Sequence, residues 1–185
     1  MKRCLLLLIA VAVMAETHAR ETAKIDPAHS KIAFHVRHLL GTAKGSFSKF
    51  SGTIVVDRER PERSSVSVRI EAASIDTGIV KRDEHLREAL FDVARYPEIT
   101  FKSRRVTHTG ANSAEIVGDL TMHGVTREIT VNVQLLSNDG KRWRATTAPL
   151  HRSQFGLMFS KSAEMVSGIA DEVAVEIEIE AQPEN

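Results

Sequence analysis

Cysteine is almost absent from the sequence: the only one among 185 residues is Cys4, close to the N-terminus. The rest of the chain cannot form an internal disulfide, so its stability must come from burial of apolar side chains. An excess of charge is also absent, with 25 Lys and Arg residues against 24 Asp and Glu. Because a balanced chain without a basic cluster lacks the electrostatic footprint of a nucleic-acid-binding protein, we expect no nucleic acid as a partner.

A long apolar run occurs only near the N-terminus, over residues 4–15. Two basic residues precede this run, and the small residues of a signal-peptidase site follow it in Thr17-His18-Ala19. The pattern predicts a cleavable signal peptide over residues 1–19, with a cut after Ala15 as an alternative, and one domain over residues 20–185. Removal of the leader leaves 25 − 2 = 23 basic and 24 − 1 = 23 acidic residues. No later run has the length of a membrane helix, so we expect an exported chain without an integral membrane segment.

Signatures of catalysis and of metal binding are missing as well. The histidines that follow the leader form no HExxH or paired Cys/His motif, and no GxSxG nucleophile elbow occurs. His35 and His38 are three residues apart, so in a strand they point to opposite faces. We therefore expect surface or structural histidines, no metal site, no catalytic cofactor and no catalytic residue. The histidines concerned are His29, His35, His38, His85, His108, His123 and His151.

Alternation of apolar and polar residues is what the sequence has in abundance. Residues 112–136 alternate on both sides of a break at His123-Gly124. Apolar residues with the same parity are Ile116, Leu120 and Met122 before the break, and Ile129, Val131, Val133 and Leu135 after it. Because successive strand side chains point to opposite faces, this pattern predicts an antiparallel hairpin with one apolar face.

The same alternation predicts six further strands. They lie within residues 30–38, 41–57, 65–72, 97–102, 143–150 and 172–180. Residues 81–93 instead have apolar residues three and four positions apart, which predicts one short amphipathic helix. Eight strands with an apolar face indicate an all-β sandwich or barrel. Small residues share the inward parity at Gly52, Ala72, Ala114 and Gly118, which leaves room for a cavity, although glycine also marks a bend.

Several segments resemble the YceI-like family of exported, lipocalin-like proteins. The matching segments are IDPAHSKIAFHVRHL, GSFSKFSGTIVVD, ASIDTGIVKRDEHLREALFDVARYPEITFKS, GDLTMHGVTREITVNV, SQFG and DEVAVEIEIEA, which follow one another over nearly all of the chain after the leader. The resemblance implies an eight-stranded antiparallel lipocalin-like barrel whose apolar tunnel holds a polyisoprenoid, such as an isoprenoid quinone or a prenyl lipid. It also implies a homodimer in the bacterial periplasm, without an established catalytic activity.

The parity of each strand then selects the residues that we expect to line such a tunnel. They are Ile32, Phe34, Val36, Phe50, Ile54, Val56, Val68, Ile70, Leu86, Leu90, Phe91, Phe101, Leu120, Met122, Ile129, Val131, Val133, Phe155, Val175 and Ile177. Polar residues that could meet a lipid head group at the mouth are His38, Arg82, Asp83 and His85. Two plainer interpretations stay open: His38 as a histidine at a strand end, and the charged residues near 82–87 as a solvated helix face.

Other functions also stay open at this point. A stress-response factor, or an enzyme acting on a lipid or small molecule at the barrel mouth, could use His38 or His85. A barrel with a filled core could instead act through its surface or through a dimer face. The presence or absence of a continuous internal cavity separates the last interpretation from the carrier hypothesis.

Overall fold

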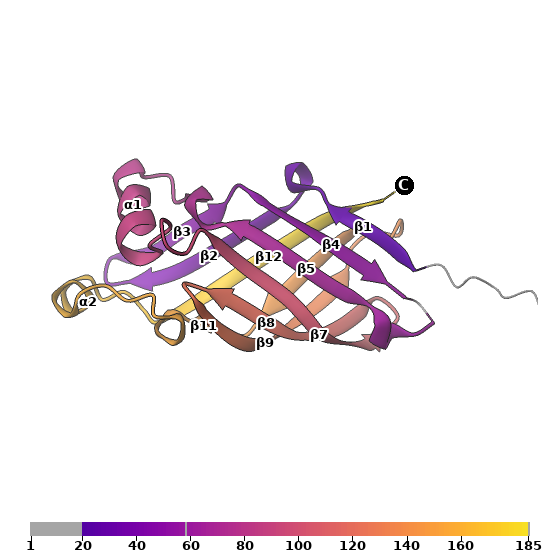
Figure 1. The fold of residues 1–185 in the computed structure, drawn as a ribbon. Helices are drawn as coiled ribbons and strands as arrows, with labels where there is room; N and C mark the ends of the chain where they lie inside the picture. Colours follow the sequence, from indigo (N-terminus) through magenta and orange to yellow (C-terminus); the bar gives the residue numbers. More distant parts are fainter. Residues whose placement is uncertain (1–19, 58, 185) are drawn as a thin grey trace, which may run out of the picture.

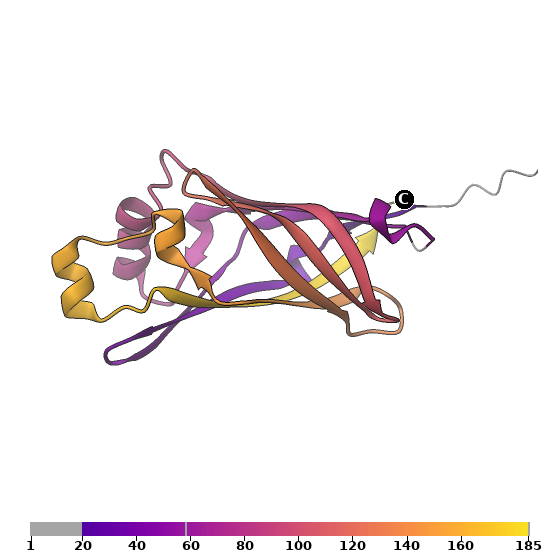
Figure 2. The ribbon, with the colours of Figure 1, turned by 90° about the horizontal axis from the view of Figure 1, so that it is seen from below.

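The computed structural model describes residues 20–57 and 59–184, with only the backbone described for residues 163, 164 and 167. The predicted leader lies outside these residues. Strand segments of the described chain form a single antiparallel sheet that closes on itself into an elongated barrel (Figures 1 and 2).

Shorter strand segments join end to end into eight long strands, as predicted. In chain order these are β1 (Glu21–Ile25) with β2 (Lys31–His38), β3 (Gly41–Phe47) with β4 (Phe50–Val56), β5 (Ser65–Glu71) with β6 (Ile75–Asp76), β7 (Glu98–Gly110), β8 (Ser113–Met122), β9 (Val125–Leu135), β10 (Arg142–Thr147) with β11 (Leu150–His151), and β12 (Glu172–Pro183). Each long strand pairs with the next, and β12 returns to pair with both β2 and β1. The sheet therefore has the closed meander of a lipocalin-like barrel.

The hairpin of β8 and β9 confirms the predicted break at His123-Gly124. Met122 pairs with Val125, so the two residues between them make the tightest possible connection. Both have positive φ, 52° at His123 and 74° at Gly124, as a two-residue hairpin turn requires. A Cβ at Gly124 would lie 2.6 Å from the ring of Tyr96, so this position needs glycine for space as well as for its backbone conformation.

The predicted helix is present and lies at one end of the barrel (Figure 1). It begins as α1 (Val80–His85) and continues as a π-helical turn, η4 (Leu86–Leu90). Arg87 donates from Nε to the carbonyl of Ala73 at 2.7 Å and from Nη2 to that of Ile75 at 2.8 Å. These bonds satisfy backbone carbonyls in the segment that leads into β6. Leu90, at the end of η4, and Phe91, directly after it, are buried.

Further short helices connect the strands. They are η1 (Pro27–His29), η2 (Pro61–Arg63), η3 (Ala72–Ser74), η5 (Arg152–Phe155) and a second α-helix, α2 (Lys161–Ser167), which the sequence analysis did not predict. Figure 2 shows α1, α2 and the turn between β2 and β3 projecting from the same end of the barrel.

Charged side chains occupy the outer face of the sheet. Arg104 pairs with Asp119 at 2.8 Å, and Arg144 pairs with Glu178 at 2.8 Å. Glu176 lies 3.5 Å from both Lys31 and His35. The polar parity of the strands thus faces solvent, which leaves the apolar parity to face inward.

Candidate functional site: an apolar tunnel

The barrel encloses a cavity of about 1150 Å³. Its wall is built from alternate residues of all eight long strands and from the inner side of α1 and η4. All but two of the apolar residues predicted to line a tunnel lie on this wall. The barrel is therefore hollow, which decides between the hollow and filled alternatives that the sequence left open.

Phe50 and Phe155 are the two exceptions, and their assignment to the tunnel wall was wrong. Phe50 is 8% exposed and packs with Ile25 and Ile32 in the wall itself, where β4 begins after the break in the long strand. Phe155 is 1% exposed and belongs to the 3-10 turn η5, so strand alternation does not apply to it. Both rings are buried in clusters of hydrophobic side chains, and neither lines the cavity.

The small inward residues contribute less to the cavity than predicted. Ala114 lines it, whereas a Cβ at Gly118 would lie 2.7 Å from the ring of Phe101, and one at Gly52 would lie 2.6 Å from the carbonyl of Ser67. These two glycines allow a close approach of neighbouring groups. The hollow results from the closure of eight strands with medium-sized aliphatic residues.

Polar residues near α1 form a small network around Thr77. Arg82 donates from Nε to the Thr77 hydroxyl at 2.7 Å and from Nη2 to the Thr77 carbonyl at 2.8 Å. The Thr77 hydroxyl in turn donates to Asp83, whose Oδ1 also accepts the Thr77 N–H at 2.9 Å. Thr77 and Arg82 both lie on the cavity wall. The network thus fixes a cation at one end of the tunnel.

Asp83 does not face the cavity, so its assignment as a head-group contact was wrong. Its side chain is 5% exposed and binds the segment before α1 through Thr77. A buried carboxylate with two donors is a structural brace between the end of β6 and the helix.

His38 and His85 both lie on the cavity wall. The strand parity indicated this position for His38, whereas His85 was a candidate only as one of the charged residues on the helix. His38 Nδ1 accepts the Leu40 N–H at 3.3 Å, which stabilises the turn between β2 and β3. The His85 ring stacks on Phe159, with ring centroids 5.6 Å apart and an interplanar angle of 5°. Each imidazole is thus held by its own neighbours at the rim of the tunnel.

Arg152 lines the same end, and the sequence analysis missed it. Its side chain is 6% exposed and donates to the carbonyls of Leu157, Ile169 and Ala170 at 2.9, 3.2 and 3.0 Å. These carbonyls lie at the two ends of residues 157–170, the loop that carries α2. Arg152 therefore closes the base of that loop, and only its place next to the SQFG segment offered a signal in the sequence.

Asp171 strengthens the same base. Burial raises the pKa of its carboxyl group, but hydrogen bonds from the N–H and hydroxyl of Ser153 and from His151 outweigh burial, so the pKa is lowered overall. The Ser153 N–H and hydroxyl each lie 2.8 Å from a carboxylate oxygen of Asp171. The Arg152 guanidinium and the Asp171 carboxylate thus both hold the base of the loop that carries α2.

We define the apolar mouth as the exposed large hydrophobic residues at this end of the barrel. They are Leu39, Leu40, Ile79, Val80, Met158, Met165 and Val166. They belong to the β2–β3 turn, the start of α1 and the loop with α2, which project together in Figure 2.

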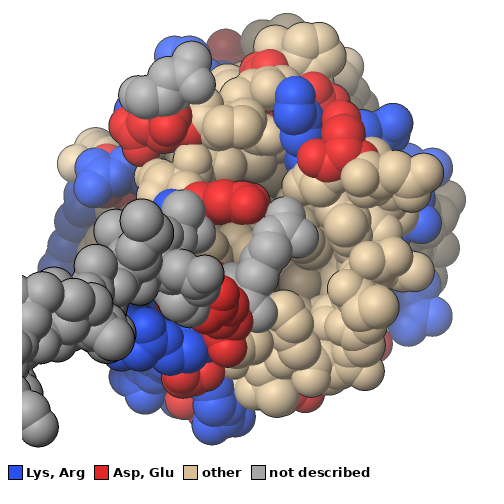
Figure 3. Space-filling view, turned by 90° about the vertical axis from the view of Figure 1, so that its right-hand side faces the viewer, with Lys and Arg blue, Asp and Glu red and all other residues tan. Residues whose placement is uncertain are grey.

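We define the charged end as the ionisable residues that line the opposite opening. They are Arg20, Glu21, Asp139, Lys141 and Glu184. Figure 3, which faces this end, shows acidic and basic side chains gathered around it. The Ser137 hydroxyl and then the Lys141 N–H bind Asp139, and these bonds lower the pKa of its carboxyl group.

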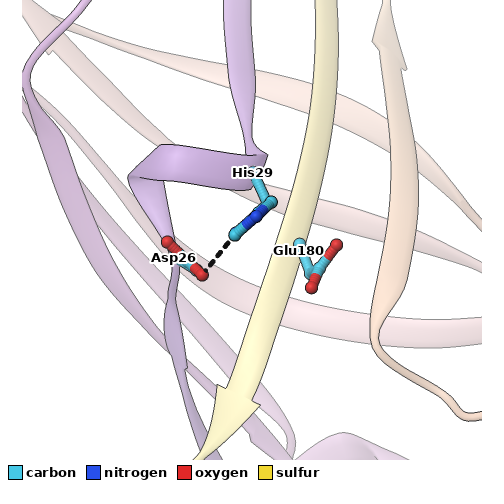
Figure 4. A group of neighbouring side chains, drawn as sticks. All are labelled: Asp26, His29 and Glu180. Carbon is cyan, nitrogen blue, oxygen red and sulfur yellow. Dashed lines mark hydrogen bonds and ion pairs between the residues drawn. The ribbon is translucent and has the colours of Figure 1, made fainter.

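A group of possible metal ligands lies on the outside of the barrel, at Asp26, His29 and Glu180 (Figure 4). The His29 ring lies 2.8 Å from Asp26, which raises the pKa of His29 and lowers that of Asp26. Asp26 also accepts the Ala28 N–H at 3.0 Å and so caps η1. This capping accounts for the cluster, and the absence of a metal site stays a prediction.

Among the residues that the structure describes, no helix combines the length and the apolar character needed to cross a bilayer.

Comparisons with known proteins agree with this architecture. The sequence model of a family described as the YceI-like domain matches residues 24–181. A UPF0312 protein of Vibrio cholerae is 34% identical over 192 residues, covering 97% of this chain and 98% of that protein. Protein YceI of Escherichia coli O157:H7 is 36% identical over 149 residues, covering 77% of this chain and 78% of that protein.

Solved structures with a similar fold include BcnA of Burkholderia cenocepacia. It is 27% identical, has a TM-score of 0.75, and the match covers 84% of this chain and 98% of BcnA. A polyisoprenoid binding domain from Saccharophagus degradans, implicated in plant cell wall breakdown, is 19% identical, with a TM-score of 0.69 and coverage of 90% and 100%. The second match shows the likeness of fold alone.

Proposed function

The chain belongs to the YceI-like family, and from that premise we propose that it is a non-catalytic carrier that holds one polyisoprenoid lipid in its tunnel. The observation that carries the proposal is the continuous cavity of about 1150 Å³ with an almost entirely apolar wall. A barrel of the same fold is described as polyisoprenoid-binding. The proposal for this chain rests on the size and lining of its own cavity.

The physics of a long prenyl tail matches this wall. Burying each methylene or methyl group removes about 0.8 kcal/mol of unfavourable exposure to water. A wall of Leu, Ile, Val and Phe side chains supplies this gain without directional contacts, so a flexible tail can bind in any rotation about its axis. The branched methyl groups of an isoprenoid also fill the spaces between alternate aliphatic side chains.

The volume sets an upper limit on the tail. A cavity of about 150 Å³ holds one benzene ring, so roughly 25 Å³ serves each carbon atom. A cavity of about 1150 Å³ then accommodates roughly forty-five carbon atoms, or about nine five-carbon units. A longer tail would extend beyond one of the openings.

The head group is assigned to the end where polar side chains interrupt the apolar wall. Arg82 uses two of its five N–H groups on Thr77, and His85 and His38 lie on the same part of the wall. These donors suit the oxygen atoms of a quinone or of a prenyl alcohol or phosphate. An isoprenoid quinone is the ligand that we propose first, because its ring can also stack beside His85 and Phe159.

The wider setting belongs to the same proposal. We place the protein in the periplasm, after cleavage of the predicted signal peptide over residues 1–19, as a homodimer. A water-filled compartment between two membranes is where an insoluble tail needs a closed carrier, because the tail cannot diffuse alone.

Extraction of the purified full-length protein with organic solvent, followed by mass spectrometry, tests the proposal. We expect a co-purified isoprenoid with up to about nine five-carbon units, and native mass spectrometry should show one copy per chain. Repeated absence of any hydrophobic passenger, together with no uptake of added quinone, would remove the carrier function.

A matched pair of variants on β10 separates tunnel binding from surface binding. Ala145 is 8% exposed and lines the cavity, whereas its neighbour Arg144 is 52% exposed and pairs with Glu178 outside. Ala145→Trp should therefore abolish the passenger, while Arg144→Trp, which adds bulk to the outer face, should leave it in place. Equal occupancy in both variants would place the lipid outside the tunnel.

The geometry does not favour the alternative of an enzyme or stress factor acting through His38 or His85. His38 Nδ1 accepts a backbone N–H within its own turn, and His85 stacks on Phe159. General acid–base work needs a side chain within reach of a reacting group and oriented by a partner, and neither histidine shows such a partner among its described contacts.

A further inference from the structure

Exposed hydrophobic side chains are distributed very unevenly over the protein. Among the described residues, seven of the eight exposed large hydrophobics belong to the apolar mouth, and the eighth is Leu136 in the turn after β9. Leu40 is 91% exposed, Met165 is 85% and Val166 is 79%, whereas Leu136 is 39%. A concentration of this kind on one end of a barrel marks an interaction surface.

The segments of the apolar mouth are close neighbours in space. A Cβ at Gly168 would lie 3.2 Å from Cβ of Leu39, and the Ala170 N–H donates to the Arg37 carbonyl at 2.8 Å. The loop that carries α2 therefore lies against the β2–β3 turn. The start of α1 projects from the same end (Figure 2).

The apolar mouth is also continuous with the tunnel. Leu39, Leu40 and Val166 are exposed at the rim and at the same time line the cavity. The apolar wall therefore continues at this end out to the outermost leucines, beside the polar groups of His38, Arg82 and His85 that line the same end. The charged end lacks this property, because Arg20, Lys141 and Glu184 line that opening.

Basic side chains accompany the exposed apolar residues. Arg37 precedes Leu39 by two positions, Lys81 directly follows Val80, and Lys161 begins α2; all three are exposed. Leucines and valines beside Lys and Arg are the composition that inserts at the interface of an anionic bilayer.

We propose that the apolar mouth docks onto a phospholipid bilayer, with the tips of the β2–β3 turn, α1 and α2 inserted among the lipid head groups, so that the tail passes between membrane and tunnel without crossing water. This inference rests on the proposed carrier function for its purpose, although docking can be measured without a tail. The occupant is a bilayer because the tunnel opens within the patch, and a bilayer is the phase in which a prenyl lipid dissolves.

Sedimentation with vesicles of phosphatidylethanolamine and phosphatidylglycerol tests the docking. The exported chain, without the predicted leader, should bind these vesicles, and Ile79→Ser/Val80→Ser combined with Met165→Ser should lower the partition coefficient at least ~10-fold, since three exposed apolar side chains that do not line the cavity no longer enter the lipid. Leu136→Ser removes an exposed leucine from the other end and should leave binding unchanged. Thermal unfolding of each variant confirms that the fold is intact.

Independent measurements separate this inference from the carrier function. Uptake of a short prenyl alcohol from cyclodextrin reports on the tunnel alone and should be equal in the wild type and the Ser variant. Normal uptake without vesicle binding by the wild type would overturn the docking and leave the carrier intact. Retention of vesicle binding by the Ser variant would also overturn the docking, whether or not that variant changes from dimer to monomer.

Discussion

The two ends of the barrel surround the same cavity with opposite chemistry. At the apolar mouth, Leu39, Leu40 and Val166 are exposed and also line the opening. At the charged end, Arg20, Lys141 and Glu184 line the opening, and Lys24 forms an ion pair with Glu184 at 2.6 Å. The wall between the two ends is mostly apolar, so the difference between the ends makes the two openings unequal for a lipid.

The difference between the ends has a structural basis. The charged end consists of strand ends and tight turns, whose polar residues satisfy exposed backbone groups. The apolar mouth is built instead from the short β2–β3 turn and two longer insertions, the segment with α1 and the loop with α2. The network around Thr77 holds the base of the first insertion, and Arg152 and Asp171 hold the base of the second. The polar side chains of the mouth therefore hold the bases of its segments, and the exposed tips of these segments are apolar.

The largest expected effect comes from removing the support of the mouth. Arg152→Met leaves the carbonyls of Leu157, Ile169 and Ala170 without their donor, and we expect a loss of about 3 kcal/mol or more in the free energy of unfolding. Lys24→Met breaks an exposed ion pair at the charged end and should cost less than about 1 kcal/mol. Urea denaturation measures both, and equal losses would show that the mouth is no more dependent on its buried cation than the other end.

The next largest effect is expected from blocking each end of the cavity in turn. Ala43 and Ala23 line the cavity near the mouth and near the charged end, respectively. Ala43→Trp should slow uptake of a fluorescent prenyl lipid from vesicles at least ~10-fold, because the tail must pass this position. Ala23→Trp should leave the rate unchanged and shorten the longest accommodated tail by about one five-carbon unit. If the effects on the rate were reversed, the tail would enter from the charged end.

A smaller effect is expected for the head group. Arg82→Met removes the cation fixed on Thr77 and should weaken binding of a quinone relative to the plain hydrocarbon tail by about 10-fold, the usual size of one charge-assisted hydrogen bond. Lys141→Met at the charged end should change this ratio by less than about twofold. Titration calorimetry with both ligands gives the ratio, and the opposite ranking of the two variants would move the head group to the charged end.

The smallest effect concerns pH and the pair outside the barrel. The pKa of His29 is raised by Asp26, so its contribution is complete below the unfolded value of about 6.5 and is lost as the pH rises through the folded value. The pKa of Asp26 is lowered by His29, so its contribution is present above about 3.8 and is lost as the pH falls through the folded value.

The pair therefore stabilises the protein most between about pH 4 and pH 6.5. His29→Asn should lower the melting temperature by about 2 °C or less within this window and leave it unchanged at pH 9. Melting curves of both proteins over this range provide the test. A difference that persists undiminished at pH 9 would assign the effect to packing of the ring instead of to its charge.

Alternation alone was enough to predict most of the strands and most of the residues that line the tunnel. A period of two is set by backbone geometry, so Phe34, Val36 and Ile177 face inward whatever their pairing partners are. The hairpin turn at His123-Gly124 was also predictable, because the alternation breaks there and glycine readily adopts the positive φ that a two-residue turn requires. The family resemblance then distinguished a barrel from a sandwich, which the pattern could not do.

The elements that escaped prediction obey no such local rule. Strand β1 has only five residues with a single large apolar side chain, and it is a strand because β4 and β12 pair with it. Helix α2 exposes Met165 and Val166, so a rule that expects helices to bury an apolar face does not find it. Arg152 and Asp83 are buried ions, which composition assigns to the surface.

Pairing between the first strand and the last has a consequence for how the protein is made. Ala23 pairs with Pro183, 183 − 23 = 160 residues later, so the ring is sealed only after residue 183 has been synthesised. Until then every growing chain has two open sheet edges and a high contact order, and its folding is slow. A chain that stops short of β12 would keep both of these edges exposed, and unpaired edges favour aggregation over closure.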